Sequence, residues 1–497
     1  MTLDQSFYPE VPDLKGNVHR EEAAYEALVR DAFAEVAIEK SISRELRLED
    51  QGIPTFVAEW LIDREQRRAA GGSLEDVRKN IHAFIREHLP RKEQKEVLRN
   101  RLSNGEVLRI LDNFRVTVDL KKNRRRLIIP SLDEVGEIET HLLEQFEGLL
   151  QGGLWGAGLL VYERPERTAS GMGEVWLREF KPLQAADIDL GYYKEQRSRF
   201  SIEQWSALLV NSMGYNPAVY NTREQQILLL TRLLPLVQRR INLIELAPKG
   251  TGKSFVFSNL SRYARIISGG KTSPAVLFYN NSTNTPGLLT RFDVVVFDEA
   301  QTIAFDNPGE VIGILKDFME SGKYTRGNQM ASSDCGVVFL GNIEIGFNGH
   351  PVRQVLFDEL PSFLRETAFI DRIHGLLPGW ELPKIQRDSP ARQLALKADY
   401  FGEVLHRLRN DGAYDAFVST HVKLVGSGSE NMRNSNAIQR LAAGYLKLFF
   451  PDLQAKPHEF ETYCLRPAIR LRQIICDQLS ILDSEYKPAS IEGTFHA

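Results

Sequence analysis

INLIELAPKGTGKSFVFSNL, residues 241–260, is the segment from which the fold of this chain follows. It begins with an apolar run that predicts a buried strand, passes through a turn rich in Gly and Pro, and enters a helix at Lys253 and Ser254. This order is the P-loop motif, whose backbone N–H groups surround a phosphate at the start of a helix. The one departure is Ala247 at the first motif position, where glycine is usual. We predict that a nucleotide is bound by Pro248, Lys249, Gly250, Thr251, Gly252, Lys253 and Ser254.

A second apolar run, RFDVVVFDEAQ at residues 291–301, ends in two acids, Asp298 and Glu299. We expect Lys253 to reach the phosphates of ATP, and Ser254 and Asp298 to hold Mg²⁺. Glu299 would polarise the attacking water. ATP and Mg²⁺ are therefore the expected cofactors.

Three further positions complete the predicted site. The strand in CGVVFLGNIEI, residues 335–345, ends at Asn342, which would sense the γ-phosphate if this strand lies between the two motif strands, as in AAA+ ATPases. Arg372 follows a short helix and would act as an arginine finger on a neighbouring subunit, the alternative being a surface ion pair with Asp371. Arg433, near a later helix start, is the predicted second sensor, with Arg440 as its competitor.

The pattern along the chain predicts an α/β AAA+ P-loop ATPase core with an α-helical lid, preceded by helices and a small antiparallel, barrel-like β domain. Strand patterning begins near residue 107 and gives way to strands alternating with helices near residue 241. We predict an N-terminal helical region at 1–106, a β domain at 107–200, the ATPase core at 201–385 and the lid at 386–497.

The composition is that of a globular protein, with 42% apolar residues, a net charge of −4, and no apolar run long enough to cross a membrane. The first residues lack the pattern of a secretory signal. Cys335, Cys464 and Cys476 are scattered, which favours small core residues over a zinc site or disulfides. We expect a cytoplasmic protein.

One local charge surplus stands out, because residues 86–126 hold 13 Lys and Arg against six Asp and Glu. Its densest part is a predicted hairpin turn, which would give salt-dependent DNA binding through phosphates or would simply be a solvated turn. The predicted DNA contacts are Lys121, Lys122, Arg124, Arg125 and Arg126.

These motifs, together with IISGGKTSPAVLFYN and TAFIDRIHGLLPGWELPK, resemble the BrxL family, the Lon-like AAA+ ATPases of BREX phage-defence systems. The resemblance implies a homo-oligomeric ring, hexameric or heptameric and single or doubled, that encircles duplex DNA and works with other BREX proteins. The motif order also resembles the MCM helicases, in which the segment matching MESGKYTRGNQM forms a hairpin facing the pore. That likeness adds Lys323 and Arg326 to the expected DNA contacts.

Two other functions stay open. Family members commonly continue into a Lon protease domain with a Ser-Lys dyad, for which these residues leave no room, so we expect no proteolysis from them. A protein remodeller resembling the ATPase half of Lon is the main alternative, although the polar segment around Tyr279 does not favour an unfolding pore loop. A scaffold that only binds ATP would not need Glu299.

Overall fold

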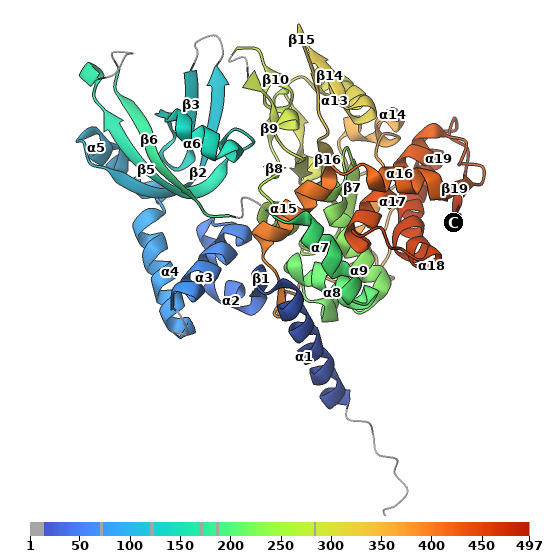
Figure 1. Cartoon of the computed structure of the whole chain (residues 1–497). Helices are drawn as coiled ribbons and strands as arrows, with labels where there is room; N and C mark the ends of the chain where they lie inside the picture. Colours follow the sequence, from blue (N-terminus) through green and yellow to red (C-terminus); the bar gives the residue numbers. More distant parts are fainter. Residues whose placement is uncertain are drawn as a thin grey trace, which may run out of the picture.

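The computed structural model describes residues 14–69, 73–119, 124–167, 172–184, 188–282 and 285–496. Figure 1 shows a β-barrel standing beside an α/β core, with the N-terminal helices beneath both and the C-terminal helices on the far side of the core. The helix α1 projects away from the rest of the chain. The predicted combination of helices, small β domain, parallel-sheet core and helical C-terminal part is therefore present.

The N-terminal helices share their core with the C-terminal part. Ser73 caps the start of one of them, its side chain accepting a hydrogen bond from the backbone N–H of Asp76. The short strand β1 (Ala37–Glu39) pairs antiparallel with β18 (Leu394–Leu396), which joins these helices to the C-terminal part. The helices are α1 (Leu14–Phe33), α2 (Lys40–Leu46), α3 (Thr55–Ala69), α4 (Leu74–His88) and α5 (Lys95–Ser103).

The small β domain is a closed barrel with the strand order β2-β3-β4-β6-β5. It differs from the predicted antiparallel domain at one place, since β4 and β6 pair in parallel. The chain passes through α6 (Thr140–Gln145) and β5 between these two strands, and β6 then returns antiparallel to β5, so β4 and β6 run in the same direction. The strands are β2 (Leu108–Asp119), β3 (Arg124–Ile129), β4 (Glu134–Ile138), β5 (Leu154–Glu163) and β6 (Glu174–Pro182).

The core is a parallel sheet of five strands in the order β17-β7-β16-β12-β8. The strand ending at Asn342 lies between the two motif strands, as the sequence predicted. Val294, Val295, Val296 and Phe297 are fully buried, as expected of a central strand. The strands are β7 (Leu243–Ala247), β8 (Ala264–Ser268), β12 (Val294–Asp298), β16 (Gly336–Asn342) and β17 (Gly375–Pro378).

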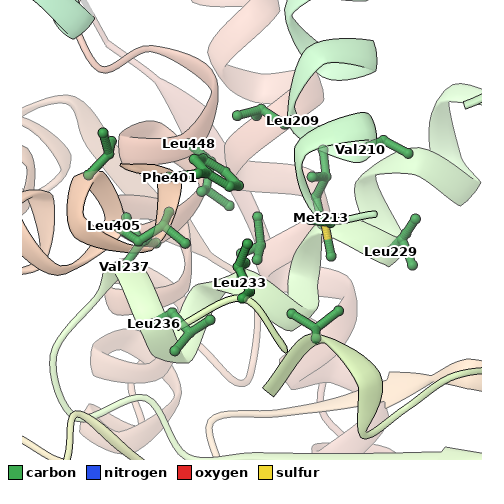
Figure 2. Close-up of a cluster of buried hydrophobic side chains, with 14 of the residues drawn as sticks. Leu209, Val210, Met213, Leu229, Leu233, Leu236, Val237, Phe401, Leu405 and Leu448 are labelled. Carbon is green, nitrogen blue, oxygen red and sulfur yellow. The ribbon is translucent and has the colours of Figure 1, made fainter. Parts of the chain in front are cut away.

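Each face of the sheet packs into its own hydrophobic core, because successive side chains of a strand point to opposite faces. Leu243 and Val294 join the core that includes the N-terminal and C-terminal helices, and their neighbours Ile244 and Val295 join the opposite one. Figure 2 shows the first core where the helices α8 (Ile202–Ser212), α9 (Arg223–Leu230), α10 (Leu234–Val237), α15 (Ala398–Arg409) and α17 (Met432–Phe449) meet.

Around the sheet the chain adds helices and short strand pairs. The first group, between the barrel and residue 305, comprises α7 (Leu190–Gln196), α11 (Phe255–Asn259), α12 (Pro274–Leu277), β9 (Lys271–Thr272), β10 (Tyr279–Asn280), β11 (Thr285–Pro286) and β13 (Ala304–Phe305). The second comprises α13 (Pro308–Ser321), the hairpin of β14 (Lys323–Arg326) and β15 (Gln329–Ser332), and α14 (Thr367–Ile370). The C-terminal part adds α16 (Ala413–His421), β19 (Val422–Val425), α18 (Pro457–Phe460), α19 (Arg466–Leu482) and β20 (Glu492–Phe495).

The three cysteines are buried, as predicted, and carry free thiols. In the part of the chain that the structure describes, no helix is both long and apolar enough to span a bilayer.

Candidate nucleotide site

The P-loop connects the end of β7 to the start of α11, the place that the sequence predicted. Gly250 has φ +84° and Gly252 has φ +70°, backbone conformations that residues with a Cβ rarely adopt. A Cβ at Gly252 would also lie 3.0 Å from the hydroxyl of Tyr215. The two glycines therefore let the loop turn tightly at the carboxyl end of the sheet.

The side chain of Lys253 links the loop to the sensor strand. Its Nζ donates to Oδ1 of Asn342 at 3.0 Å and to the carbonyls of Ala247 and Pro248 at 3.2 and 3.3 Å. Burial lowers the pKa of Lys253, an effect that the carboxylates of Glu245 and Asp298 oppose. Lys253 and Asn342, 89 positions apart in the chain, thus meet at one point.

The two acids end β12 beside that point. Asp298 Oδ1 accepts the backbone N–H of Glu299 at 2.9 Å. Glu299 is exposed and has φ +53°, an uncommon conformation for a residue with a side chain that is often found at functional sites. Its carboxylate lies against Gly269, where a Cβ would be 3.3 Å from Oε2 and where φ is +56°. Gly269 therefore keeps the space beside this carboxylate clear.

Ser254 and Asp298 offer the oxygen ligands that Mg²⁺ prefers. Ser254 stands at the start of α11, and its hydroxyl caps none of that helix's backbone N–H groups. Asp298 ends the strand next but one to β7 in the same sheet. The donor chemistry of this pair fits the ion.

A buried ion pair supports the loop from below, and the sequence reasoning missed it. Arg232 and Glu245 are 1% and 3% exposed, and Nη2 of Arg232 lies 2.7 Å from Oε1 of Glu245. The same Nη2 donates to the carbonyl of Thr251, and Tyr215 donates its hydroxyl proton to the carbonyl of Gly252. The sequence did contain a signal for this pair. Arg232 lies inside the apolar run LLLTRLLPLV and Glu245 inside INLIEL, and a buried charge requires a partner of opposite sign.

A cavity of about 500 Å³ opens beside Gly252. Tyr215, Phe255 and Ile385 give it an apolar wall, and Arg44 and Thr55 from the N-terminal helices line its other side. Its volume lies within the range of about 300–1,000 Å³ that small-molecule sites occupy. The P-loop therefore continues into a space of nucleotide size.

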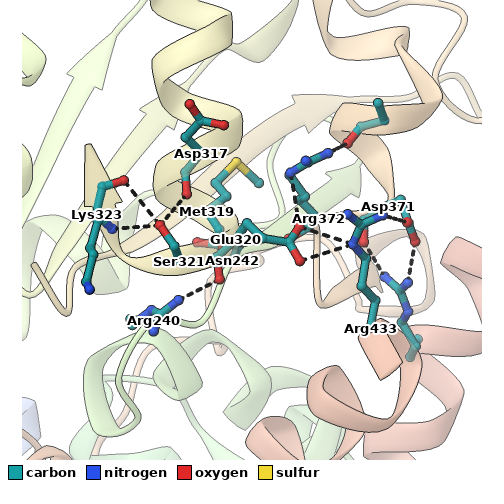
Figure 3. A network of polar contacts seen from close by, with 12 residues as sticks. Arg240, Asn242, Asp317, Met319, Glu320, Ser321, Lys323, Asp371, Arg372 and Arg433 are labelled. Atoms are coloured by element: carbon teal, nitrogen blue, oxygen red, sulfur yellow. Dashed lines mark hydrogen bonds and ion pairs between the residues drawn. The ribbon is translucent and has the colours of Figure 1, made fainter. Parts of the chain in front are cut away.

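The predicted arginines lie at the other edge of the sheet (Figure 3). Arg372 precedes β17, whose first residue Gly375 pairs with Leu243 at the start of β7, whereas the P-loop follows the end of β7. The two edges are four residue steps apart along β7, a distance of about 13 Å. Arg372 forms its ion pair with Glu320, Nε to Oε2 at 3.2 Å, and not with the adjacent Asp371 that the sequence suggested as an alternative. Asp371 is not available to Arg372 because it is buried between Arg433 and Arg472, at 2.6 and 2.7 Å.

Arg433 lies beside Arg372, near the start of α17 as predicted. Its Nε is 3.1 Å from Oε2 of Glu320, which the two arginines share. Arg440 is further along α17, close to His374. The pKa of His374 lies well below its usual range, mainly because of burial and also because Arg440, Arg472 and Arg240 place positive charge near it. The role of Arg433 as the second sensor, with Arg440 as competitor, stays a prediction. Its ion pairs place it away from the P-loop of its own chain.

The predicted DNA contacts fall in two places. Lys121 and Lys122 lie outside the described residues. On β3, Arg124 forms an ion pair with Glu174 at 3.3 Å, and Arg125 and Arg126 are exposed. On the β14–β15 hairpin, Lys323 is exposed, but Arg326 is held by Glu310 and by the carbonyl of Tyr279. All seven assignments stay predictions.

A P-loop, two acids and a sensor asparagine at one edge of a parallel sheet, with the sensor strand between the motif strands, define a P-loop ATPase domain of the AAA+ type. Residues 175–492 match the family described as "Lon-like protease BrxL-like, ATPase domain", and residues 31–162 match "BREX system Lon protease-like protein BrxL N-terminal". The chain belongs to this BrxL family, which confirms the resemblance seen in the motifs.

Two relatives illustrate the extent of the similarity. The chain is 30% identical over 471 residues to the Lon-like protease BrxL of Escherichia coli, which covers 94% of this chain and 66% of that protein. It is 30% identical over 450 residues to the Lon-like protease BrxL of Bacillus cereus, which covers 90% of this chain and 65% of that protein. The chain thus spans just under two thirds of the length of these relatives.

Proposed function

We propose that the chain hydrolyses ATP at the P-loop edge of its sheet. The observation that carries this proposal is the 3.0 Å contact between Lys253 and Asn342, which joins the phosphate-binding loop to the sensor strand. Lys253 and the loop N–H groups would bind the phosphates, and Asn342 and Glu299 would orient and polarise the attacking water. The cavity beside Gly252 would take the base and ribose.

Ser254 and Asp298 would hold Mg²⁺. When bound, the ion neutralises charge on the phosphates. Asp298 is fixed for this task by the hydrogen bond that its Oδ1 accepts from the backbone of Glu299.

The proposed site is completed by a second copy of the chain. Arg372 lies at the opposite edge of the sheet from the P-loop, about 13 Å away along β7. A head-to-tail contact would bring this edge against the P-loop edge of a neighbour, and repeating that contact closes a ring. We therefore propose a homo-oligomeric ring, hexameric or heptameric, in which Arg372 stabilises the charge of the neighbour's transition state. Release from Glu320 would free it to do so.

The ring would bind or encircle duplex DNA, as a translocase or a nucleotide-gated clamp in BREX-type phage defence. The family membership supports the defence role, and the exposed basic side chains Arg125, Arg126 and Lys323 support contact with phosphates. The alternative role is ATP-dependent remodelling of proteins. It is supported by the name "Lon-like protease" that the two relatives carry.

ATP turnover measured with duplex DNA, with unfolded protein and with neither separates these roles. We expect duplex DNA to stimulate ATP turnover and unfolded protein to leave it unchanged. Stimulation by unfolded protein alone would replace the DNA proposal with the remodelling role. Electron microscopy of the Glu299→Gln protein with ATP and duplex DNA should show a ring with DNA in its centre, and monomers under those conditions would contradict the assembly.

A further inference from the structure

Three arginines meet where the barrel adjoins the ATPase core. Arg115 is on β2 of the barrel, Arg265 is on β8 at the edge of the sheet, and Arg291 lies just before β12. Burial, together with the positive charges of Arg115 and Arg265, lowers the pKa of Arg291 to about 10. Three positive charges therefore act on one another in a confined space.

These arginines differ from several basic residues of the barrel and of the helix before it. Within residues 86–126, Lys95, Arg99, Arg101, Arg109 and Arg124 each have a carboxylate partner at 2.6 to 3.3 Å. At the junction itself, Arg262 is paired with Glu403 at 2.9 Å. Within the described ranges, Arg115, Arg265 and Arg291 have no ion pair. The charge of the buried Asp112 acts on Arg115, but its carboxylate accepts the backbone N–H groups of Asn113 and Ser131.

The backbone holds the cluster together. The loop before β5 passes between the two domains: a Cβ at Gly152 would lie 3.3 Å from the ring of Phe292, and one at Gly153 would lie 2.8 Å from Oδ1 of Asn113. Both glycines have positive φ, +122° and +112°. Because this loop packs closely against both domains, Arg115 and Arg291 are held on either side of it. The two domains therefore stay together although these arginines repel one another.

A cavity of about 810 Å³ adjoins Arg291. Its lining combines Gln151 of the barrel with Arg240, Arg291 and Lys323 of the core. Each acid in the lining has an arginine partner, since Asp293 lies 3.8 Å from Arg409 and Asp334 lies 3.5 Å from Arg239. The cavity is therefore electropositive and reaches the base of the β14–β15 hairpin.

We propose that Arg115, Arg265 and Arg291 bind the phosphodiester backbone of nucleic acid at the barrel–core junction. This inference rests on the proposed DNA-binding function and adds a site that the basic turns did not indicate. Duplex DNA carries a charge for about every 1.7 Å of its axis, so several phosphates can face the cluster together. Arg265 is exposed, which leaves the site open to a ligand that continues along the surface. The site lies across the width of the sheet from Arg372, four strand spacings or about 19 Å away.

The test is fluorescence anisotropy of a labelled duplex with the full chain over a range of KCl concentrations. The variants are Arg265→Gln, the double variant Arg265→Gln/Arg291→Gln and the charge-preserving Arg265→Lys. The matched control is Lys423→Gln, which removes an exposed charge from the strand β19. We expect the slope of log affinity against log salt to fall by about one for each arginine removed, and affinity to fall roughly tenfold or more. Arg265→Lys and the control should bind as the wild type does.

Thermal unfolding of the free proteins checks that the variants fold. Removing one of three mutually repelling charges should leave the midpoint unchanged or raise it, so weaker binding would not reflect loss of structure. If the wild-type chain binds the duplex and the double variant binds with the same affinity and slope, the cluster is not a DNA site although the proposed function stands. If the wild type binds no duplex, both proposals fail.

Two further outcomes would assign the cluster to another phosphate. Displacement of the duplex by inorganic phosphate at constant ionic strength would indicate a site for the free ion. A fall in ATP turnover without DNA, with duplex binding unchanged, would indicate contact with a neighbour's nucleotide. Either result overturns the inference.

Discussion

The two edges of the parallel sheet are chemically opposite. The carboxyl edge carries the P-loop glycines, Lys253 and two acids, and a cavity of nucleotide size opens beside Gly252. The amino edge carries arginines, three of which (Arg372, Arg433 and Arg472) share Glu320 and Asp371. The first edge offers the P-loop and Lys253 to a phosphate, and in the second these three arginines outnumber the two carboxylates that they share. Each edge therefore supplies what the other needs, as head-to-tail assembly requires.

Arg372→Ala tests the role of the amino edge with the largest expected effect. An arginine finger contributes about 10³–10⁵ to the rate, so ATP turnover should fall by that factor while ATP binding persists. Turnover and nucleotide affinity are measured separately, the latter by titration with a fluorescent ATP analogue. Arg365→Ala, an exposed arginine in the same segment, is the control and should be active. Undiminished turnover in Arg372→Ala would remove the finger from the account.

Glu299→Gln tests the carboxyl edge. Loss of the group that polarises water should lower turnover by about 10²–10⁴, with ATP retained in the assembled protein. The measurement is single-turnover hydrolysis together with the fraction of nucleotide that remains bound. Glu87→Gln, which changes an exposed acid on α4, should match the wild type. Hydrolysis at the wild-type rate would show that another group activates the water.

Arg232→Met tests whether the P-loop depends on the buried pair beneath it. Removal of one partner leaves Glu245 buried and unpaired, which should destabilise the fold by about 3–5 kcal/mol in chemical denaturation. Arg232→Met/Glu245→Leu should recover most of that stability. Because the hydrogen bond from Arg232 to Thr251 is also lost, we expect ATP affinity to stay reduced in both variants. Full affinity in the stable double variant would show that the loop holds its shape without the pair.

We expect Glu320→Gln to have the smallest effect on ATP turnover, and to raise turnover rather than lower it. It removes the carboxylate that holds Arg372 and Arg433, which frees the finger for a neighbour. An exposed ion pair contributes about 0–1 kcal/mol, so turnover should rise by up to about fivefold at low salt, and less at high salt. A large decrease would mean that Glu320 positions Arg372 rather than restrains it.

The sequence predicted the carboxyl edge far better than the amino edge. The P-loop, Asp298 and Asn342 stand at ends of apolar runs, so local pattern alone places them at one edge of a parallel sheet. The partner of Arg372 was not predictable, because Glu320 comes from α13 and approaches only when the sheet is assembled. The same holds for the pairing of β1 with β18 and for the parallel contact of β4 with β6, which depend on crossings of the whole chain.

Charge counting along the sequence was also misleading. Part of the surplus in residues 86–126 is neutralised by Asp133, Glu134, Glu174 and Glu179, which lie elsewhere in the barrel. The arginines of the junction, Arg115, Arg265 and Arg291, are single charges in three separate segments. Only the fold brings them together.

The central claim is that one subunit's P-loop edge works with another subunit's arginine edge. A mixture of Lys253→Ala and Arg372→Ala chains tests it most directly, because each variant retains the edge that the other lacks. We predict that neither variant hydrolyses ATP alone and that an equal mixture does, since about a quarter of the contacts in random rings would pair two intact edges. An inactive mixture, in which native mass spectrometry shows both chains within the same rings, would contradict the account.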